Sequence, residues 1–147
     1  MPSTDIFHLS TPALWLEALP VAQVLWPDLI ADDYLKRLAD MTAKGYALYG
    51  IRSEGALAGI AGVQEISLLA RGKVLWLFDM AVLPGHRGGG LGVRLLEHLK
   101  ELARNGGYSR LLLHTSADRE ATCGFYRSQL GEPFGVVFRA VTGEPLA

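Results

Sequence analysis

The sequence lacks the features that mark several classes of protein. Its 147 residues include one cysteine, Cys123, so an internal disulfide is excluded, as is usual in reducing compartments. No apolar run approaches the roughly 20 residues of a membrane-spanning helix, and residues 1–10 lack the basic and apolar regions of a signal peptide. The net charge of −1 gives no reason to expect nucleic acid or an anionic membrane as a partner. We therefore expect a soluble, cytoplasmic protein.

Size and charge distribution narrow the possibilities further. Half of the residues are hydrophobic, and the length fits one domain, residues 1–147, with a single sizeable core. Residues 1–70 carry eight acidic and four basic side chains, a net charge of −4. Residues 71–127 carry nine basic and five acidic side chains, a net charge of +4. The basic part suits a polyphosphate ligand, and the acidic part suits a cationic amine.

The most informative stretch is residues 74–105. Residues 74–83 are apolar on both faces except for Asp79, which is typical of a strand covered on both sides. A proline turn and a glycine loop, residues 87–93, lead into a helix with apolar residues at helical spacing. Unpaired N–H groups and the helix dipole favour an anion at such a helix start, and glycines let the backbone approach it closely.

Two common phosphate-binding loops are excluded by inspection. The chain has no Gly-x-x-x-x-Gly-Lys-Ser/Thr sequence, and the third glycine of Gly-x-Gly-x-x-Gly would fall on Val93 or Leu95. The remaining pattern is Arg87-x-x-Gly90-x-Gly92, preceded by Met-Ala-Val-Leu-Pro at residues 80–84. This pattern resembles motif A of the GNAT superfamily, the acyl-CoA-dependent N-acyltransferases. The alternative is a glycine-rich turn between strand and helix that binds nothing.

The resemblance implies both the fold and the donor substrate. It implies an α/β (α+β) fold with a mixed, mostly antiparallel central sheet, a parallel strand pair at the CoA site and flanking helices, as a single acyl-CoA N-acyltransferase domain. In this family the central strand splays from its parallel neighbour, so that the pantetheine arm bonds to free backbone groups. The N–H of Met80 would then lie at the acyl carbonyl. The implied acetyl-CoA-binding residues are Met80, Ala81, Val82, Arg87, Gly88, Gly89, Gly90, Leu91, Gly92, Val93 and Arg119.

The remaining segments predict the order of elements around this motif. Thr11 or Ser10 caps a helix that begins at Pro12, and Pro20 interrupts it. Gly59 and Gly62 indicate a bulge or a close backbone contact within a strand. The other expected elements are a strand at 5–9, a helix at 27–43, a hairpin of strands 46–51 and 56–63, a strand at 109–115 parallel to the central strand, a helix at 119–130 capped by Asp118, and a last strand at 134–141.

A second signature supplies the expected acid. The segment from Asp118 to Gly131 resembles the second family motif, although Arg119 and Thr122 stand where Asn and Ala are usual. Arg119 is expected to contact a phosphate in place of the usual Asn. Tyr126 matches the family's tyrosine, which implies that its hydroxyl protonates the departing CoA sulfur. The alternative for Tyr126 is a packing role beside Phe125.

The general base is left open by the sequence. Asp79 is the only ionisable group in the central strand, and it is either the base or a structural hydrogen-bonding group. His114 and water are the other candidates. Cys123 has no histidine nearby in the sequence to activate it, so we expect direct transfer within a ternary complex rather than an acyl-enzyme.

The expected function is therefore an N-acetyltransferase that moves an acetyl group from acetyl-CoA to a primary amine, without a metal. The acceptor is a small-molecule or peptide amine, and a homodimer is compatible with the family. The alternatives are a non-catalytic module that binds or senses acyl-CoA, and an interaction domain that binds no nucleotide.

Overall fold

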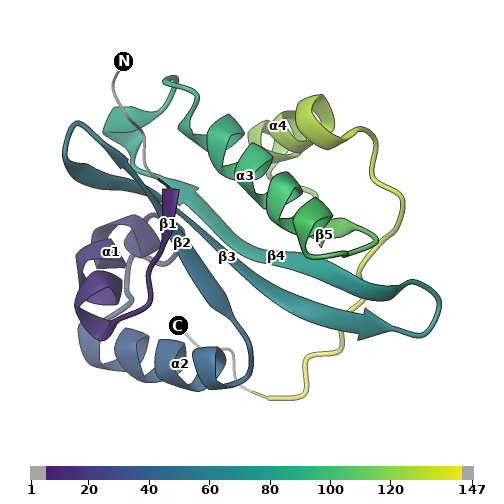
Figure 1. Ribbon diagram of the computed structural model, residues 1–147, viewed down its shortest axis with the longest axis horizontal. Coiled ribbons are helices and arrows are strands. Elements are labelled where there is room, and N and C mark those ends of the chain that lie inside the picture. Colours follow the sequence, from purple (N-terminus) through teal and green to yellow (C-terminus); the bar gives the residue numbers. More distant parts are fainter. Residues whose placement is uncertain (1–5, 144–147) are drawn as a thin grey trace.

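The computed structural model describes residues 6–143 and contains one five-stranded sheet with strand order β1-β2-β3-β4-β5 (Figure 1). Strands β1 to β4 pair antiparallel, and β4 and β5 pair parallel, which confirms the predicted fold class. The elements are β1 (Ile6–His8), α1 (Pro12–Leu25), α2 (Ala31–Ala43), β2 (Ala47–Ser53), β3 (Ala56–Leu68), β4 (Gly72–Val82), a short 3-10 helix η1 (Pro84–His86), α3 (Leu91–Asn105), β5 (Leu111–Leu113) and α4 (Glu120–Leu130).

The sheet separates two apolar clusters. Helices α1 and α2 pack on one face, and α3 and α4 lie over the other (Figure 1). Helix α3 shows why its sequence forms this arrangement, because Leu91, Leu95 and Leu99 recur about one turn apart and are buried against the sheet. The helix ends at Asn105, before Gly106 and Gly107, and Gly107 has a φ of +73°.

Helix α1 differs from the prediction at Pro20. Thr11 caps the helix as expected, since its Oγ1 accepts a hydrogen bond from the N–H of Leu14 at 3.3 Å. The helix nevertheless continues through Pro20 to Leu25. Pro20 and Leu16, whose carbonyl loses its helical partner, both lie on the exposed side, where water can solvate that carbonyl. The second helix begins at Ala31 rather than at residue 27.

The strands also differ in length from the prediction. Strand β3 extends to Leu68 instead of ending at residue 63, because it pairs with β4 along its whole second half. Strand β5 is confined to Leu111–Leu113, and β1 begins at Ile6, with Asp5 outside the described residues. The ladder between β3 and β4 shifts register between Gly62 and Val63, which confirms the irregularity that the glycines indicated.

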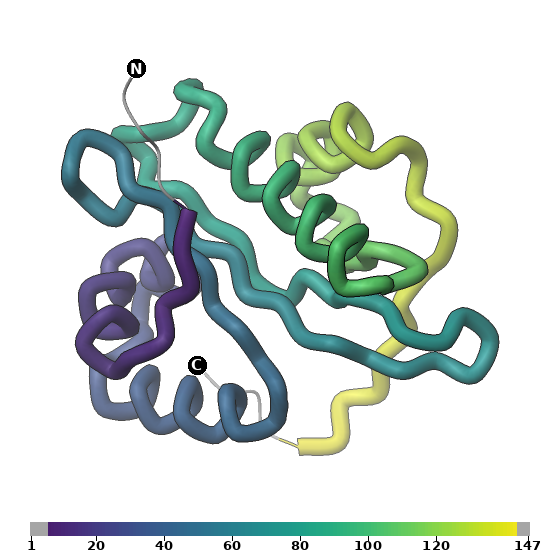
Figure 2. The backbone as a smooth tube through the Cα atoms, in the orientation of Figure 1, coloured from purple at the N-terminus to yellow at the C-terminus, as the bar shows by residue number. Residues whose placement is uncertain are grey.

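Two predictions near the C-terminus are wrong. Asp118 does not cap α4: Arg119 occupies that position, and a carboxylate oxygen of Asp118 instead accepts a hydrogen bond from the Ser116 hydroxyl at 2.5 Å. Residues 134–141 form no strand; they run as an extended, exposed segment away from α4 (Figure 2). Their composition favours a strand, but a strand also needs a partner edge, and within residues 6–143 the segment pairs with none.

Candidate active site

Strands β4 and β5 separate at the position that the family pattern indicates. Their parallel pairing runs from Leu75–Leu111 to Leu77–Leu113 and then stops, whereas β4 continues to Val82. On its other side, β4 stays paired with β3 as far as Val82. Among the described residues, the β5-facing edge of β4 at residues 80–82 therefore has no strand partner, which leaves room for an extended ligand to bond to the backbone.

The glycine loop presents free backbone amides next to this edge. Gly88 and Gly90 have φ values of +87° and +79°, a conformation that favours glycine. Gly90 is the N-cap of α3 and provides no side-chain cap, and the first backbone hydrogen bond runs from the N–H of Arg94 to the Gly90 carbonyl at 3.0 Å. Within residues 6–143, the amides of residues 91–93 thus have no recorded acceptor. This arrangement fits a bound phosphate.

Arg87 lies at the start of the loop and is exposed. Its Nε donates to the carbonyl of Val82 at 3.3 Å, so the side chain is folded back toward the end of β4. This contact links the loop to the free edge and places a positive charge between the two. A ligand with a polyphosphate and an amide-containing arm matches that combination.

Helix α4 is held against the start of α3 by its aromatic pair. A Cβ at Gly92 would lie 3.4 Å from the ring of Phe125, so the glycine permits close packing there. Tyr126 is partly buried and packs against the apolar cluster around Leu95, as do Met80 and Val82. Burial raises the pKa of the Tyr126 phenol, and the charge of Arg119 opposes this shift. The hydroxyl therefore carries its proton at neutral pH.

Asp79 faces the other side of β4, and among the described residues its hydrogen-bond partner is Tyr46. The hydroxyl of Tyr46 donates to a carboxylate oxygen of Asp79 at 2.7 Å. Burial raises the pKa of Asp79, and the hydrogen bond from Tyr46 counteracts this increase. Tyr46 is itself buried, and it reaches Asp79 across position 62, where a Cβ would overlap the tyrosine hydroxyl. Gly62 is therefore required for this contact.

The side chain of Asp79 lines a hollow of about 350 Å³ on the α2 side of the sheet. The residues that line the hollow are Met41, Tyr46, Gln64, Phe78, Asp79 and His114. Trp76 lies beside it, with ring centres 6.1 Å from Phe78 and 6.0 Å from His114, and its buried indole N–H has no hydrogen-bond partner among the described residues. The hollow combines an acid, a histidine and aromatic faces, which together suit an amine.

The structure brings together some predicted residues and separates others. Asp79 and His114 share the hollow, whereas Tyr126 packs against the apolar cluster on the opposite face of the sheet. The thiol of Cys123 donates to the carbonyl of Ser116 at 3.6 Å and does not line the hollow. Sequence reasoning missed Tyr46 and Gln64, because only the folded sheet places them beside Asp79.

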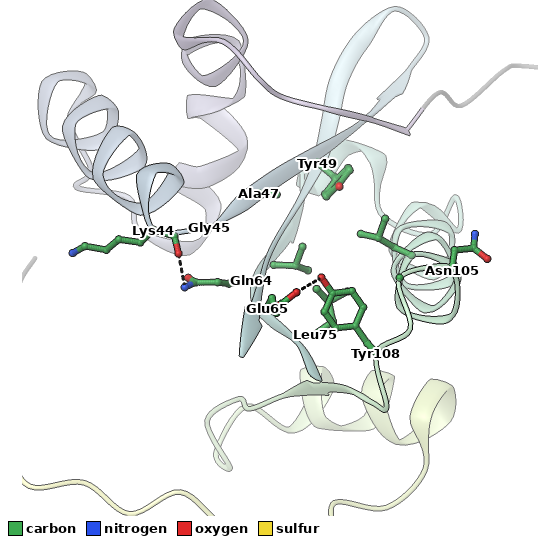
Figure 3. A pocket seen from close by; sticks show the side chains of 12 residues that line it. Lys44, Gly45, Ala47, Tyr49, Gln64, Glu65, Leu75, Asn105 and Tyr108 are labelled. Atoms are coloured by element: carbon green, nitrogen blue, oxygen red, sulfur yellow. Dashed lines mark hydrogen bonds between the residues drawn. The ribbon is translucent and has the colours of Figure 1, made fainter. Parts of the chain in front are cut away.

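A larger hollow, of about 710 Å³, lies elsewhere and holds none of the predicted site residues. Figure 3 shows its walls, with Tyr49, Leu75 and Tyr108 on the α3 side of the sheet and Lys44 and Gln64 on the other side. The hydroxyl of Tyr108 donates to Glu65 at 3.0 Å there. Size alone therefore does not identify the site.

Comparison with known proteins decides the family. A sequence profile described as "Acetyltransferase (GNAT) family" matches residues 11–131. The chain belongs to this family. As a member of this family, the protein is an acyl-CoA-dependent N-acetyltransferase whose donor is acetyl-CoA, as the resemblance of the loop motif implied.

Individual relatives agree with this assignment. The chain is similar to the uncharacterized N-acetyltransferase YhdJ of Bacillus subtilis (strain 168), with 26% identity over 125 residues that cover 84% of this chain and 88% of YhdJ. The structure resembles the aminoglycoside N-acetyltransferase AAC(6')-Iy in complex with CoA, with a TM-score of 0.82, 19% identity and 97% of each chain covered. It also resembles a ribosomal-protein-alanine N-acetyltransferase from Brucella melitensis biovar Abortus 2308, with a TM-score of 0.80, 19% identity and coverage of 97% and 100%. These two structural likenesses show the fold.

Two kinds of feature are absent from the described part of the chain, residues 6–143. None of the helices within residues 6–143 has the length and apolar character needed to cross a membrane. The same residues contain no group of three or more His, Cys, Asp or Glu side chains that could hold a metal ion.

Proposed function

We propose that this GNAT enzyme transfers the acetyl group directly from acetyl-CoA to a primary amine while both substrates are bound. The observation that carries the proposal is the free edge of β4 next to the free amides at the start of α3. The amides of residues 91–93, together with Arg87 and Arg119, hold the phosphates. The edge at residues 80–82 holds the pantetheine arm in the manner of an added strand.

Met80 contributes through its backbone. Its N–H stabilises the acyl oxygen as that oxygen gains negative charge, and loss of such a donor typically lowers a rate by about 10²- to 10³-fold. Because β3 fixes one side of β4 at this position, the group is held in place before the substrate arrives. That rigidity supports its use as an oxyanion donor.

Asp79 acts as the general base in this proposal. An amine attacks only in its neutral form, so a proton has to leave it at the site. Burial raises the pKa of Asp79, which makes the carboxylate a better proton acceptor than an exposed aspartate. Tyr46 holds one carboxylate oxygen, and the hollow gives an amine access to Asp79.

Tyr126 acts as the general acid from the opposite face of the sheet. Its phenol is protonated at neutral pH, because burial raises its pKa. Proton donation to the departing CoA sulfur completes the reaction, in which the new C–N bond forms as the C–S bond breaks. The placement of Asp79 and Tyr126 on opposite faces of β4 supports approach of the amine and the donor from opposite sides.

The acceptor is proposed to be a small-molecule or peptide amine that inserts its amino end into the hollow beside Asp79. The aromatic face of Phe78 and the net charge of −4 on residues 1–70 favour a cationic amine. A cytoplasmic location is proposed from the single cysteine and the need for acetyl-CoA.

The test is a panel of amines screened for CoA release from acetyl-CoA. The panel includes polyamines, amino acids, aminoglycosides and peptide N-termini, with calorimetry of CoA binding alongside. Release with at least one amine supports the proposal. Binding of acetyl-CoA without release for every amine supports a sensing module instead, and absence of binding contradicts both functions.

A further inference from the structure

The larger hollow, of about 710 Å³, has the volume of a small-molecule site but takes no part in the proposed acetyl transfer. It lies between the second half of β3 and the last turn of α3. Part of its lining is apolar, because Val63 and Leu75 are buried there and Leu102 is half-buried. Such a lining can hold the apolar body of a ligand, and the polar groups beside it determine the class of ligand.

Two tyrosines lie on two sides of the hollow (Figure 3). Tyr49 belongs to β2, and Tyr108 follows the end of α3. A Cβ at Gly106 would lie 2.5 Å from the ring of Tyr108, so this glycine is required for the position of the ring. The ammonium of Lys73 lies 4.4 Å from the centre of that ring, so the ring already attracts a cation of the protein itself. The aromatic walls therefore favour a positively charged ligand.

The polar atoms beside these rings need hydrogen-bond donors. Oε1 of Glu65 accepts from the Tyr108 hydroxyl at 3.0 Å, and the Lys73 ammonium, 3.9 Å away, is too distant for a hydrogen bond. Within residues 6–143, Oε2 of Glu65 has no recorded donor and the Tyr49 hydroxyl has no recorded partner. Burial raises the pKa of both tyrosines, so their hydroxyls stay neutral. A ligand that fills these positions has to bring N–H groups.

The C-terminal ends of two helices border the hollow. Asn105 and Gly106 line it at the end of α3, and Lys44 and Gly45 line it at the end of α2. The C-terminal end of a helix carries a partial negative charge, which favours a cation. The ammonium of Lys44 is paired with Asp40 at 3.0 Å, so its charge is compensated. The electrostatic surroundings thus agree with the hydrogen-bond requirement.

We propose that the larger hollow is a second ligand site, which binds a primary ammonium that carries an apolar body of about the size of one aromatic ring. The ammonium donates to Glu65 and to the hydroxyl of Tyr49, and the body packs on the apolar lining. This site does not rest on the function proposed for the smaller hollow. The two hollows are neighbours, because Gln64 lines both, so the experiment has to tell them apart.

The first test is the binding of 2-phenylethylamine without acetyl-CoA, so that no acetyl transfer can occur. Two-dimensional amide NMR spectra of the isotope-labelled protein locate the bound amine. Shifts are expected at residues 63–65, 75 and 105–108, with a Kd on the order of 1 mM, as is usual for a ligand of about nine non-hydrogen atoms. Shifts confined to residues 41, 79 and 114 would place the amine in the smaller hollow and overturn the proposal, as would absence of binding at about 10 mM amine.

Two matched ligands test the requirement for a cation. 3-Phenylpropanoate and 2-phenylethanol carry the same ring with a carboxylate and a neutral hydroxyl, respectively. Both are expected to bind about 10-fold more weakly than the amine, because neither supplies a charged N–H donor to the carboxylate. Equal affinity for the three ligands would show an unselective apolar surface and would overturn the proposal.

Variants of the protein test the residues that hold the ligand. Glu65→Gln should weaken binding of the amine about 10-fold, because the acceptor loses its charge. Glu120→Gln, on an exposed residue of α4 outside the hollow, makes the same change of charge and should leave the affinity unaltered. Ala47→Phe fills part of the hollow and should abolish binding of the amine. Full affinity in Glu65→Gln, or an equal loss in Glu120→Gln, contradicts the site.

Discussion

The two sides of β4 are built from different kinds of groups. On the proposed donor side, the groups available to a ligand are backbone groups, at residues 80–82 of the strand and at the amides of residues 91–93 of α3. On the acceptor side they are the side chains Asp79, Tyr46 and His114, which come from three separate parts of the chain. Backbone groups survive most substitutions, whereas side chains change with each one. The proposed donor site therefore depends less on side-chain identity than the proposed acceptor site does.

The charge distribution follows the same division. Residues 71–127, with a net charge of +4, form β4, α3, β5 and most of α4, where the phosphates are expected. Residues 1–70, with a net charge of −4, form the helices and strands on the side of the hollow. The field of the protein therefore favours an anionic donor on one side and a cationic acceptor on the other.

The largest effect is expected on the acceptor side, from Asp79→Asn. The amide keeps the shape of the side chain but cannot accept the amine proton, so kcat/KM should fall toward the upper end of the 10²- to 10⁴-fold range that is typical of a lost general base. CoA affinity should stay unchanged, because the donor side is untouched. Steady-state rates of CoA release and calorimetry measure the two quantities separately.

A matched control separates the loss of the general base from the loss of a negative charge elsewhere. Glu101→Gln removes a carboxylate that pairs with Arg104 on the outer face of α3 and should leave the rate within about twofold, since exposed ion pairs contribute little. If Asp79→Asn also retains the full rate, Asp79 is structural, and His114 or water takes its place as base.

The next effect tests the donor side through Tyr126→Phe. The rate is expected to fall toward about 10²-fold, the lower end for a lost acid, because a thiolate with a pKa near 8.5 leaves fairly easily without a proton. Affinity for CoA should be preserved. Tyr108→Phe, which loses a hydroxyl bonded to Glu65 on the same side of the sheet, is the control and should show full activity. Equal rates for the two variants would retire Tyr126 as the acid.

A smaller effect is expected for the backbone of the loop. Gly90→Ala places a side chain at φ +79°, where a residue other than glycine costs roughly 1–2 kcal/mol. Relief of that strain turns the amides of residues 91–93 away from the phosphate, so CoA binding should weaken by about 5- to 30-fold. Gly85→Ala, in η1, is the control: its φ is not positive, and no heavy atom of the described residues lies within 4 Å of a new Cβ. Calorimetry with CoA should find that control unchanged.

The strand, turn, loop and helix of the proposed donor side could be predicted from the sequence, because their signals are local. An apolar strand, a turn, two glycines with positive φ and an amphipathic helix lie within about 30 consecutive residues, and each has a direct effect on backbone geometry. The separation of β4 from β5 was implied by the family resemblance, and the end of pairing at Leu77–Leu113 agrees with it. For this strand–loop–helix segment, the local sequence pattern and the fold of the family predict the same structure.

The acceptor side could not be predicted, because its contacts join distant residues. Tyr46 and Asp79 are 33 positions apart, and only the pairing of β3 with its neighbours brings the hydroxyl over Gly62 to the carboxylate. Gly62 indicated a bulge or a close contact in the strand, but the sequence did not show that the approaching group is the Tyr46 hydroxyl. The expected strand at 134–141 is absent for a related reason: its residues favour a strand, but none of the five strands within residues 6–143 pairs with it.

The smallest effect, and the sharpest test of the acceptor side, is the pH profile of Tyr46→Phe. The hydrogen bond from Tyr46 lowers the pKa of Asp79, so its removal should raise that pKa further above the ordinary aspartate value. A base works only when deprotonated, so the acidic limb of the kcat/KM profile should move to higher pH, with little change on the plateau. The other titratable groups near this pair are His114 in the hollow and Tyr34, whose pKa burial raises to about 12. Tyr49→Phe, on the α3 face, should leave the limb in place, and an unmoved limb in Tyr46→Phe would show that the group titrating in the profile is not Asp79.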